Sequence, residues 1–279
     1  MKKYLVLGSS GQIGSHLSAY LRSKNHRVFE FDVIKDSKKD LREPNNKILE
    51  EYIQECDFVF FLAFDVGGSR YLEKYQDSYD FIHNNMFIMA NTFKILKESA
   101  KPFLFASSQM SDMGYSTYGL CKALGERYTA SIDGISVRLW NVYGYEKDFD
   151  KSHVITDFIL KAKDNGHIDI LTDGSEQRQM LYADDCCECL YILSERYADL
   201  DRYKKYHITN FRWTSIEDVA KEVCSNFTGV DYSKSEKKDM VHQGWKTEPD
   251  NYILNFWQPK VSLSDGVKKI IKMMDKDNV

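Results

Sequence analysis

A glycine-rich turn at residues 8–14 stands between two strongly patterned segments near the start of the chain. Residues 2–10 have the apolar character of a buried strand that ends in turn residues, and residues 11–26 follow an amphipathic helical pattern. A second strand is expected at 26–32. A strand, a crossover helix and a second strand make a βαβ unit, whose two strands lie parallel in one sheet. The turn therefore predicts an α/β fold.

The same alternation continues to about residue 144. Helices are expected at 47–54, 80–100 and 118–131, between strands at 56–64, 102–109 and 134–144. This order predicts a Rossmann-type, doubly wound parallel sheet. Farther along, short helices and strands mix, as in a smaller α+β lobe. We expect a first domain at residues 1–147 plus about 181–206, and the smaller lobe at about 148–180 and 207–279.

The charge balance argues against two classes of partner. The 279 residues include 38 Lys and Arg and 42 Asp and Glu, for a formal net charge of −4. Such a chain lacks the basic excess that binds nucleic acid or an anionic membrane surface. No segment approaches the roughly 18 apolar residues of a membrane span, and the first apolar stretch is shorter than a signal sequence requires. We therefore predict a cytoplasmic protein with no nucleic-acid or membrane partner.

Several residue types with potential chemistry are expected to be structural. Three of the six cysteines crowd into residues 186–189, but no second ligand pair follows at zinc-finger spacing, so we predict buried thiols and no metal site. Four histidines have no partner pattern and are expected to be structural or exposed: His83, His153, His207 and His242. Three tryptophans are expected in the core of the smaller lobe: Trp213, Trp245 and Trp257.

The glycine spacing itself predicts a dinucleotide site. A GxxGxxG pattern between strand and helix provides a tight turn at Gly8, close backbone approach to a pyrophosphate at Gly11, and helix-to-strand packing at Gly14. The start of the helix adds free N–H groups and the positive end of its dipole. The neighbours of these glycines, Ser10, Gln12 and Ile13, are then expected to touch the cofactor. The alternative is an ordinary turn.

Asp32 decides which dinucleotide is favoured. It ends the second strand, near the position where an acidic residue binds the diol of the adenosine ribose. Its carboxylate would repel a 2′-phosphate, so NAD is favoured over NADP, although nearby lysines keep NADP open: Lys35, Lys38 and Lys39. Further cofactor contacts are expected at the adenine from Asp40 and Leu41, and at the nicotinamide half from Leu62, Ala63 and Phe64.

Tyr118 and Lys122 are four residues apart on a predicted helix, so both side chains face the same way. They follow Ser107 and Ser108, at the carboxyl end of a strand, where open α/β sheets bind ligands. A phenol has a pKa of about 10 and is a weak base until a cation stabilises the phenolate. We expect Lys122 and the positive nicotinamide ring to supply that charge, Tyr118 to take a substrate proton, and Ser108 to bind the reacting oxygen. The alternative is a core aromatic beside a surface lysine.

These motifs, in this order, resemble an extended short-chain dehydrogenase/reductase of the sugar-nucleotide epimerase and dehydratase group. The likeness includes RLWNVYG at 138–144 and covers nearly the whole chain. It implies a dinucleotide domain and a nucleotide-sugar lobe, with Ser107, Tyr118 and Lys122 also touching the cofactor. It implies substrate contacts from Val66, Gly67, Gly68, Ser108, Asn141 and Arg178, the last through the diphosphate. It also implies a homodimer in which the helices at about 80–100 and 118–131 pair with their symmetry mates.

Departures from the family pattern narrow the chemistry. Dehydratases of the group carry an Asp-Glu pair where this chain has Gln109 and Met110, and the GDP-mannose 3,5-epimerases carry a proton-shuttling Cys at the second position. Redox chemistry at one carbon, C4, is what remains. A likeness to those epimerases at 63–74 favours a GDP-linked sugar, as in a GDP-manno-heptose 4-dehydrogenase of capsule synthesis. A 4-epimerase, a dinucleotide-binding sensor and a reductase of small ketones stay open as alternatives.

Overall fold

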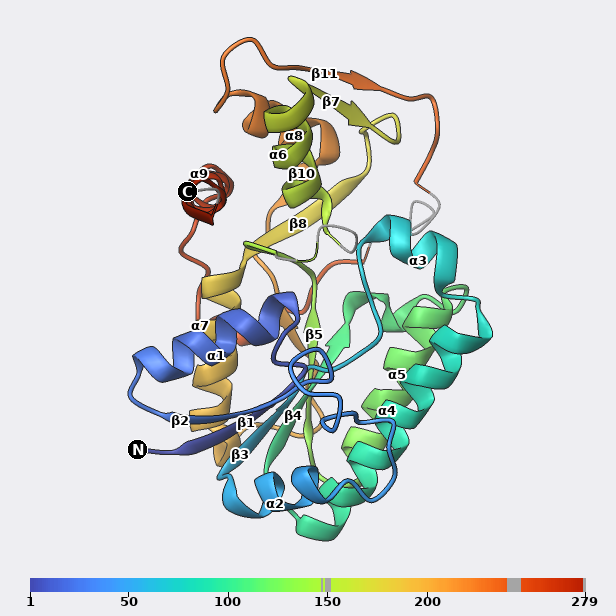
Figure 1. Cartoon of the computed structure of the whole chain (residues 1–279), viewed down its shortest axis with the longest axis vertical. Helices are drawn as coiled ribbons and strands as arrows, with labels where there is room; N and C mark the ends of the chain where they lie inside the picture. The colour runs from blue at the N-terminus through green and yellow to red at the C-terminus, as the bar shows by residue number, and fades with distance from the viewer. Residues whose placement is uncertain (147, 149–151, 240–246, 278–279) are drawn as a thin grey trace.

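The structure is a computed structural model that describes residues 1–146, 148, 152–239 and 247–277. Its centre is a six-stranded parallel sheet with the order β2-β1-β3-β4-β5-β9, seen edge-on in the lower part of Figure 1. The strands are β1 (Lys3–Leu7), β2 (Arg27–Phe31), β3 (Phe58–Phe61), β4 (Phe103–Ser108), β5 (Ile135–Leu139) and β9 (Tyr206–Ile208). In this order β2 and β3 lie on opposite sides of β1. Open α/β sheets bind ligands at the carboxyl ends of the strands where the strand order reverses in this way, so a ligand is expected there.

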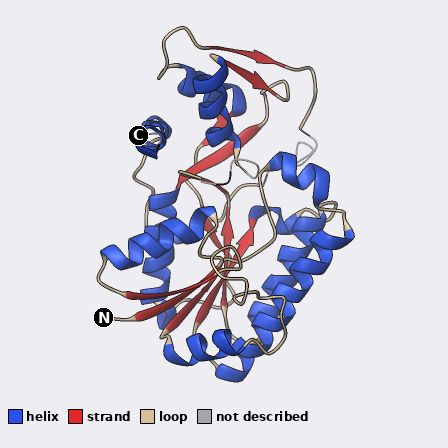
Figure 2. Cartoon of the chain, viewed as in Figure 1, coloured by secondary structure: helices blue, strands red, loops and turns tan. Residues whose placement is uncertain are grey.

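Helices cover both faces of this sheet (Figure 2). One face carries α1 (Gln12–Ser23) and α7 (Ala183–Glu195), and the other carries α2 (Lys47–Glu55), α4 (Tyr79–Ser99) and α5 (Thr117–Ser131). The alternation of β1 explains the two layers, because Tyr4 and Val6 enter the core under α1 while Leu5 and Leu7 enter the core under α4. The predicted doubly wound parallel sheet is confirmed.

A second unit lies beyond the carboxyl ends of the strands, at the top of Figure 1. Its strands are β6 (Asn141–Tyr143), β8 (Gln177–Tyr182) and β10 (Trp213–Ser215) in one sheet, and β7 (His167–Ile170) and β11 (Asp231–Lys234) in another. Its helices are α6 (Val154–Asn165), α8 (Ile216–Cys224) and α9 (Leu263–Asp277), which enclose a separate apolar core. The strand predicted at 134–144 is therefore two strands, and they belong to different sheets.

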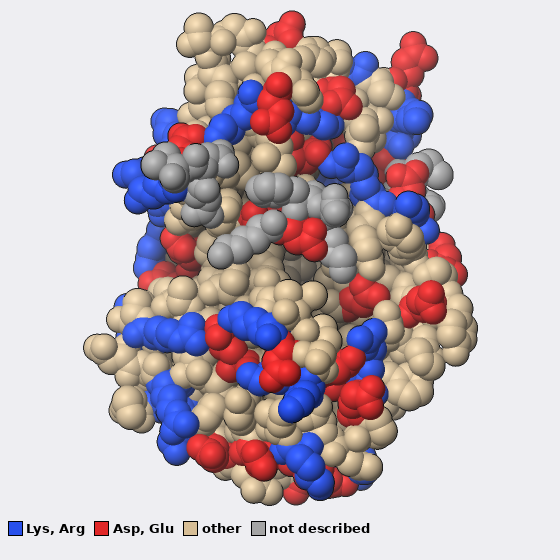
Figure 3. Space-filling view, viewed as in Figure 1, with Lys and Arg blue, Asp and Glu red and all other residues tan. Residues whose placement is uncertain are grey.

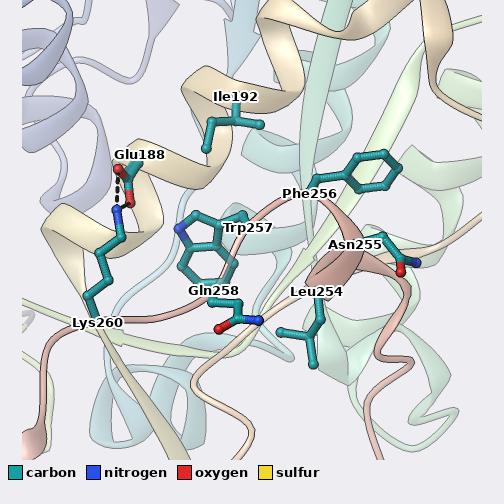
Figure 4. A pocket seen from close by; sticks show the side chains of 8 residues that line it. All are labelled: Glu188, Ile192, Leu254, Asn255, Phe256, Trp257, Gln258 and Lys260. Carbon is teal, nitrogen blue, oxygen red and sulfur yellow. Dashed lines mark hydrogen bonds and ion pairs between the residues drawn. The ribbon is translucent and has the colours of Figure 1, made fainter.

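The chain crosses between the units once more after β11. The short helical turn η3 (Tyr252–Asn255) and Trp257 join the core beneath the large sheet, against α7. Figure 4 shows Trp257 beside Ile192, and Lys260 ion-paired to Glu188 of α7 at 2.6 Å. The prediction that Trp257 fills the smaller lobe is therefore wrong, as is the assignment of all of 207–279 to that lobe.

Other residues singled out in the sequence have clear places. Trp213 is only half-buried and meets Trp140 edge-on at a ring distance of 5.7 Å, while Trp245 lies outside the described residues. As expected, the cysteines at 186, 187 and 189 are buried in the α7 layer, where burial raises the pKa of each thiol. Within the described ranges, no helix is both long and apolar enough to cross a membrane. Acidic and basic side chains are interspersed over the face drawn in Figure 3.

Two short elements shape the region above the sheet. They are the helix α3 (Ser69–Tyr75), which follows β3, and the 3₁₀ turn η1 (Gln109–Asp112), which follows β4. Elsewhere in the chain, another 3₁₀ turn, η2 (Tyr197–Asp199), follows α7. A small apolar cluster of Leu72, Phe81, Met110 and Met113 joins α3, α4 and η1 beside Tyr118. This cluster fixes the wall of the sheet edge at which the predicted catalytic residues stand.

Candidate active site

A cleft of about 1650 Å³ runs along the carboxyl ends of β1 to β5 and separates the two units. Its floor is the glycine turn, and its walls come from the residues that follow β2, β3 and β4, from the first turns of α5 and from the β5–β6 junction. Most of the site residues predicted from the sequence line this cleft. The sheet topology brings them together because every one of these strands ends at the same edge.

The glycine turn holds its shape through backbone packing. Gly8 has a φ of +83°, and a Cβ there would lie 2.7 Å from the main chain of Ala63. A Cβ on Gly14 would lie 2.0 Å from the Gly8 carbonyl oxygen. A Cβ on Gly11 would meet only that same oxygen, at 3.5 Å, and Gly11 precedes α1 with no side chain capping the helix. The start of α1 therefore presents its backbone to the cleft.

The polar groups around this turn fit a dinucleotide. Ser10 Oγ and Gln12 Nε2 are buried and find no hydrogen-bond partner among the described residues. Asp32 lines the cleft, and its carboxylate accepts hydrogen bonds from the Ser10 N–H at 2.7 Å and the Ile34 N–H at 3.0 Å. Unpartnered donors beside a helix N-terminus suit a pyrophosphate, and a fixed strand-end carboxylate suits a ribose diol.

The adenine side differs from expectation. Asp40 and Leu41 line the cleft, but the Asp40 carboxylate is bound by the Arg42 guanidinium at 2.6 Å, and this hydrogen bond lowers the pKa of Asp40. Arg42 also lines the cleft and donates to Asn84 Oδ1 at 3.2 Å; the sequence analysis does not include it.

The three lysines near Asp32 are not equivalent. Lys35 is ion-paired to Glu30 at 2.8 Å, and Lys39 donates to the Glu30 carbonyl oxygen at 3.0 Å. Both line the cleft, whereas Lys38 is not among its lining residues. Of the three lysines that leave NADP as an alternative cofactor, Lys35 and Lys39 therefore already contact Glu30.

Tyr118 and Lys122 project from the first turns of α5 toward the end of β4. Ser116 caps this helix by accepting the Gly119 N–H at 3.1 Å, and a Cβ on Gly119 would lie 2.2 Å from the Met110 carbonyl oxygen. The start of α5 is thereby held tightly against η1. Ser108, whose Oγ accepts the Met110 N–H at 3.1 Å, lines the same wall of the cleft and acts on the pKa of Tyr118, so the predicted proton carrier and the predicted oxygen-binding hydroxyl are neighbours.

Lys122 is buried under an aromatic ring. Its Nζ donates to the Ala106 carbonyl oxygen at 2.7 Å and lies 3.6 Å from the centroid of the Phe64 ring. Burial is the main cause that lowers the pKa of Lys122, to about 7. An amine with this pKa changes its charge near neutral pH.

The predicted effect of Lys122 on Tyr118 is not found in this arrangement. Burial raises the pKa of Tyr118 to about 12, and the neighbouring Ser108 hydroxyl opposes that shift. The amine lies 5.8 Å from the centroid of the Tyr118 ring, because the carbonyl oxygen of Ala106 holds it beneath Phe64. Lys122, which we expected to stabilise the phenolate together with the nicotinamide ring, is therefore not among the groups that shift the pKa of Tyr118 here.

The remaining cofactor residues divide into two groups. Ile13, Leu62, Ala63 and Phe64 line the cleft as predicted. Ser107 also borders it, but its hydroxyl donates to Glu126 Oε1 at 2.7 Å, inside the protein. Ser107 therefore contributes its backbone to the cleft and its side chain to a buried network.

On the substrate side, Val66, Gly67 and Gly68 line the cleft. A Cβ on Gly68 would lie 2.5 Å from the Ser152 carbonyl oxygen, so glycine lets this loop touch the segment that opens α6. Asn141 lines the cleft too, and its Oδ1 is buried with no partner among the described residues. A buried acceptor without a donor suits a hydroxyl or amide of a polar ligand.

Arg178 is placed differently from the prediction. It is buried on β8, forms an ion pair with Asp239 and donates to the Gln177 carbonyl oxygen at 2.9 Å. It is not among the residues that line the cleft. The structure therefore does not bring its guanidinium together with the other predicted substrate residues.

A Glu146–His153 pair lines the substrate half of the cleft, and the sequence analysis missed it. Glu146 Oε1 lies 2.6 Å from His153 Nδ1, and Oε2 accepts the His153 N–H at 2.9 Å. A hydrogen-bonded imidazole can donate or accept a proton through its other nitrogen. The His153 side chain is 37% exposed, as one of the two expectations had it, but its place in the lining of the cleft was not predicted.

The other histidines have structural places where they are described. Burial lowers the pKa of His207 to about 4, and its ring accepts a hydrogen bond from Trp140 Nε1 at 3.2 Å. His83 stacks on Tyr79 at a ring distance of 5.1 Å, and His242 lies outside the described residues. Of these four histidines the structure describes three, and His153 is the one among those three that lines the cleft.

Comparisons with known proteins place the chain in one family. The model of the "NAD dependent epimerase/dehydratase family" matches residues 4–209. A GDP-L-fucose synthase of Sinorhizobium fredii is 26% identical over an alignment of 305 positions, which covers 96% of this chain and 94% of the relative.

Two solved structures share the fold. An epimerase of Methanothermobacter thermautotrophicus has a TM-score of 0.85 at 17% identity and covers 99% of this chain and 93% of its own. A GDP-6-OMe-4-keto-L-xylo-heptose reductase from C. jejuni has a TM-score of 0.82 at 18% identity and covers 100% and 98%. Because the family model spans most of the chain, and the glycine turn and Asp32 fit its cofactor, this chain belongs to the NAD-dependent epimerase/dehydratase family.

Proposed function

We propose that this protein is an NAD-dependent oxidoreductase that moves a hydride at C4 of a nucleotide-linked sugar, as a 4-dehydrogenase or a 4-epimerase. The observation that carries the proposal is that Ser108, Tyr118 and the buried Lys122 line one wall of the cleft together, at the end of β4. A protein that only senses a dinucleotide has no use for a titratable phenol there. Bound NAD⁺ supplies the acceptor for a hydride from the carbon that is oxidised.

The chain's own residues have separate roles in this proposal. Ser108 donates to the reacting oxygen of the sugar, and Tyr118 takes the proton from its hydroxyl as the carbonyl forms. Lys122, held at the Ala106 carbonyl, would bind the ribose of the cofactor and, together with the nicotinamide ring, would supply positive charge for the phenolate once NAD⁺ is bound. Asn141 offers its unpartnered acceptor to the substrate, and the Glu146–His153 pair stands on the same side.

A GDP-linked sugar is the substrate we favour. The GDP-L-fucose synthase and the GDP-heptose reductase carry GDP in their names, whereas other similar proteins carry UDP, and the name of the reductase specifies a 4-keto sugar. The absence of an acidic pair after Ser108, where this chain has Gln109 and Met110, supports redox chemistry over water elimination. The cytoplasmic location predicted from the sequence stays a prediction.

The test is turnover with defined nucleotide-sugars. The protein is incubated with NAD⁺ and, separately, NADP⁺, and with GDP-, UDP-, dTDP- and CDP-sugars, while NADH absorbance and sugar stereochemistry are followed. Net NADH with a GDP-sugar supports a dehydrogenase, and an inverted sugar without net NADH supports an epimerase. No response in either channel, with NAD⁺ bound, would favour the sensor, and turnover of small ketones alone would favour the ketone reductase.

The matched variant is Tyr118→Phe, which removes one hydroxyl and keeps the ring that meets Phe64 edge-on at 5.8 Å. We expect turnover to fall about 10²- to 10⁴-fold while NAD⁺ affinity stays within about twofold, because only proton transfer is lost. Undiminished turnover would remove Tyr118 from the mechanism. Lost NAD⁺ affinity would assign it to binding instead.

We also propose that two copies pair through α4 and α5, which lie side by side in Figure 1. Large apolar side chains are exposed on both helices: Ile82 and Phe87 on α4, and Leu120, Leu124 and Tyr128 on α5. The three on α5 recur every four residues, so they form one face, and a second copy of the same face would bury it. Light scattering should give twice the mass of the 32.6 kDa chain, and Leu124→Glu should halve it.

A further inference from the structure

Behind the catalytic wall, one buried carboxylate joins three elements. Glu126 Oε1 accepts hydrogen bonds from Ser107 Oγ at 2.7 Å, Ser111 Oγ at 2.9 Å and Arg138 Nε at 2.8 Å. Its Oε2 accepts the Arg138 NH2 group at 2.9 Å. These donors come from the end of β4, from η1 and from β5, while Glu126 itself stands on α5.

Each of these contacts bears on a residue of the proposed reaction. Ser107 is the chain neighbour of Ser108, and Glu126 is one helical turn beyond Lys122 on the same face of α5. A bidentate Arg–carboxylate pair is directional and is worth more when buried, where water does not compete. The Arg138 side chain is 3% exposed and that of Glu126 is 15% exposed, so this pair is shielded from solvent.

We propose that Glu126 is a positioning residue for the Ser108–Tyr118–Lys122 group: it ties the end of β4 to α5 and places a carboxylate one helical turn from the Lys122 amine. The proposal rests on the proposed function for its catalytic meaning, but its electrostatic part concerns the protein alone.

The groups that face Lys122 decide the direction of this effect. Burial disfavours its charge, and Glu126 and Cys121, both on α5, favour it. From the other elements, the Ala106 carbonyl oxygen accepts from Nζ, and the Phe64 and Phe105 rings lie 3.6 and 5.1 Å from it. Glu126 is the described carboxylate that acts on this amine, and Arg138 and the two serine hydroxyls keep its own pKa low.

Asp112 offers a matched control. Asp112 also pairs with Arg138, whose NH2 group donates to Asp112 Oδ1 at 3.0 Å. Removing the charge of Asp112 therefore also weakens the hydrogen bonds of Arg138. It differs in two ways: its side chain is 39% exposed, with Lys205 at 3.7 Å, and it is not among the groups that act on Lys122. His207 of β9 lies near the same cluster, and the charges of Arg138, Asp112 and Glu126 all act on its pKa.

The experiment titrates Lys122 directly in the full chain. Lysine is labelled with ¹³C at Cε, the Lys122 resonance is assigned with Lys122→Met, and its midpoint is followed with pH in wild type, Glu126→Gln and Asp112→Asn. We expect Glu126→Gln to lower the midpoint by about 1 pH unit, since an opposite charge is lost, and Asp112→Asn to leave it within a few tenths. In turnover, the upper pH limit of kcat should move down with the midpoint in Glu126→Gln, at little change in KM.

Equal midpoints in all three proteins, or equal shifts in both variants, would overturn the proposal and leave Glu126 a purely structural residue. If Glu126→Gln does not fold, Glu126→Asp carries the test, because it keeps the charge but is too short to reach all its donors. It should lower kcat with the Lys122 midpoint retained, and wild-type kcat would contradict the positioning role. Since the midpoint needs no substrate, a shift without any turnover would refute the proposed function and not the partnership of Glu126 with Lys122.

Discussion

The two halves of the cleft are built in different ways. The dinucleotide half depends on one continuous strand–turn–helix segment, in which Gly8 and Gly14 have no room for a side chain. The substrate half is assembled from the loop after β3, the β5–β6 junction and the segment that opens α6, which come together only in the folded protein. Backbone geometry over a few residues therefore fixes the first half, and side-chain pairs between distant segments fix the second.

The largest expected effect on stability and NAD⁺ binding distinguishes two of the three glycines of the turn, Gly14 and Gly11. Gly14→Ala places a Cβ 2.0 Å from the Gly8 carbonyl oxygen, so we expect a loss of about 3 kcal/mol or more in unfolding free energy and no measurable NAD⁺ binding. Gly11→Ala meets that oxygen only at 3.5 Å and should cost about 1 kcal/mol or less, while NAD⁺ affinity falls more than about tenfold. Denaturant unfolding and cofactor titration measure both. Equal stability of the two variants would contradict the packing argument.

A smaller effect is expected at the far end of the same half. Asp32→Asn keeps an acceptor for the Ser10 N–H but loses the charge, so NAD⁺ affinity should fall about tenfold. NADP⁺ affinity should rise at the same time, because the repulsion of a 2′-phosphate is removed and Lys35 and Lys39 stand nearby. Titration with both cofactors decides. A parallel loss for NAD⁺ and NADP⁺ would show that Asp32 only holds the turn.

The smallest effect should mark the substrate half. Glu146→Gln weakens the contact with His153 and, if the halves are independent, should raise KM for the nucleotide-sugar about threefold with NAD⁺ affinity unchanged. Glu188→Gln is the control, since Glu188 of α7 is ion-paired to Lys260 (Figure 4) and is not among the residues that line the cleft. Changed NAD⁺ affinity in Glu146→Gln would mean that the halves are coupled, and the comparison would then need revision.

The fold was largely predictable because its signals are local. The apolar run of β3 and the amphipathic pattern of α1 each follow from a few neighbouring residues. The break at Trp140 was not predictable, because its N–H bonds to the Ile208 carbonyl oxygen at 3.3 Å, a contact between residues far apart in the chain. The same holds for Trp257, whose place under the large sheet depends on how the chain returns after β11.

The site divides along the same line. The sequence by itself determined the glycine turn, Asp32 and the alignment of Tyr118 with Lys122, since strand–helix geometry fixes their spacing. Only the tertiary structure decided which charges meet: Arg178 turns to Asp239, Lys122 to the Ala106 carbonyl, and Glu146 to His153. The physical reason is that backbone conformation depends on near neighbours, whereas a buried charge takes whichever partner the packed elements bring within hydrogen-bond reach.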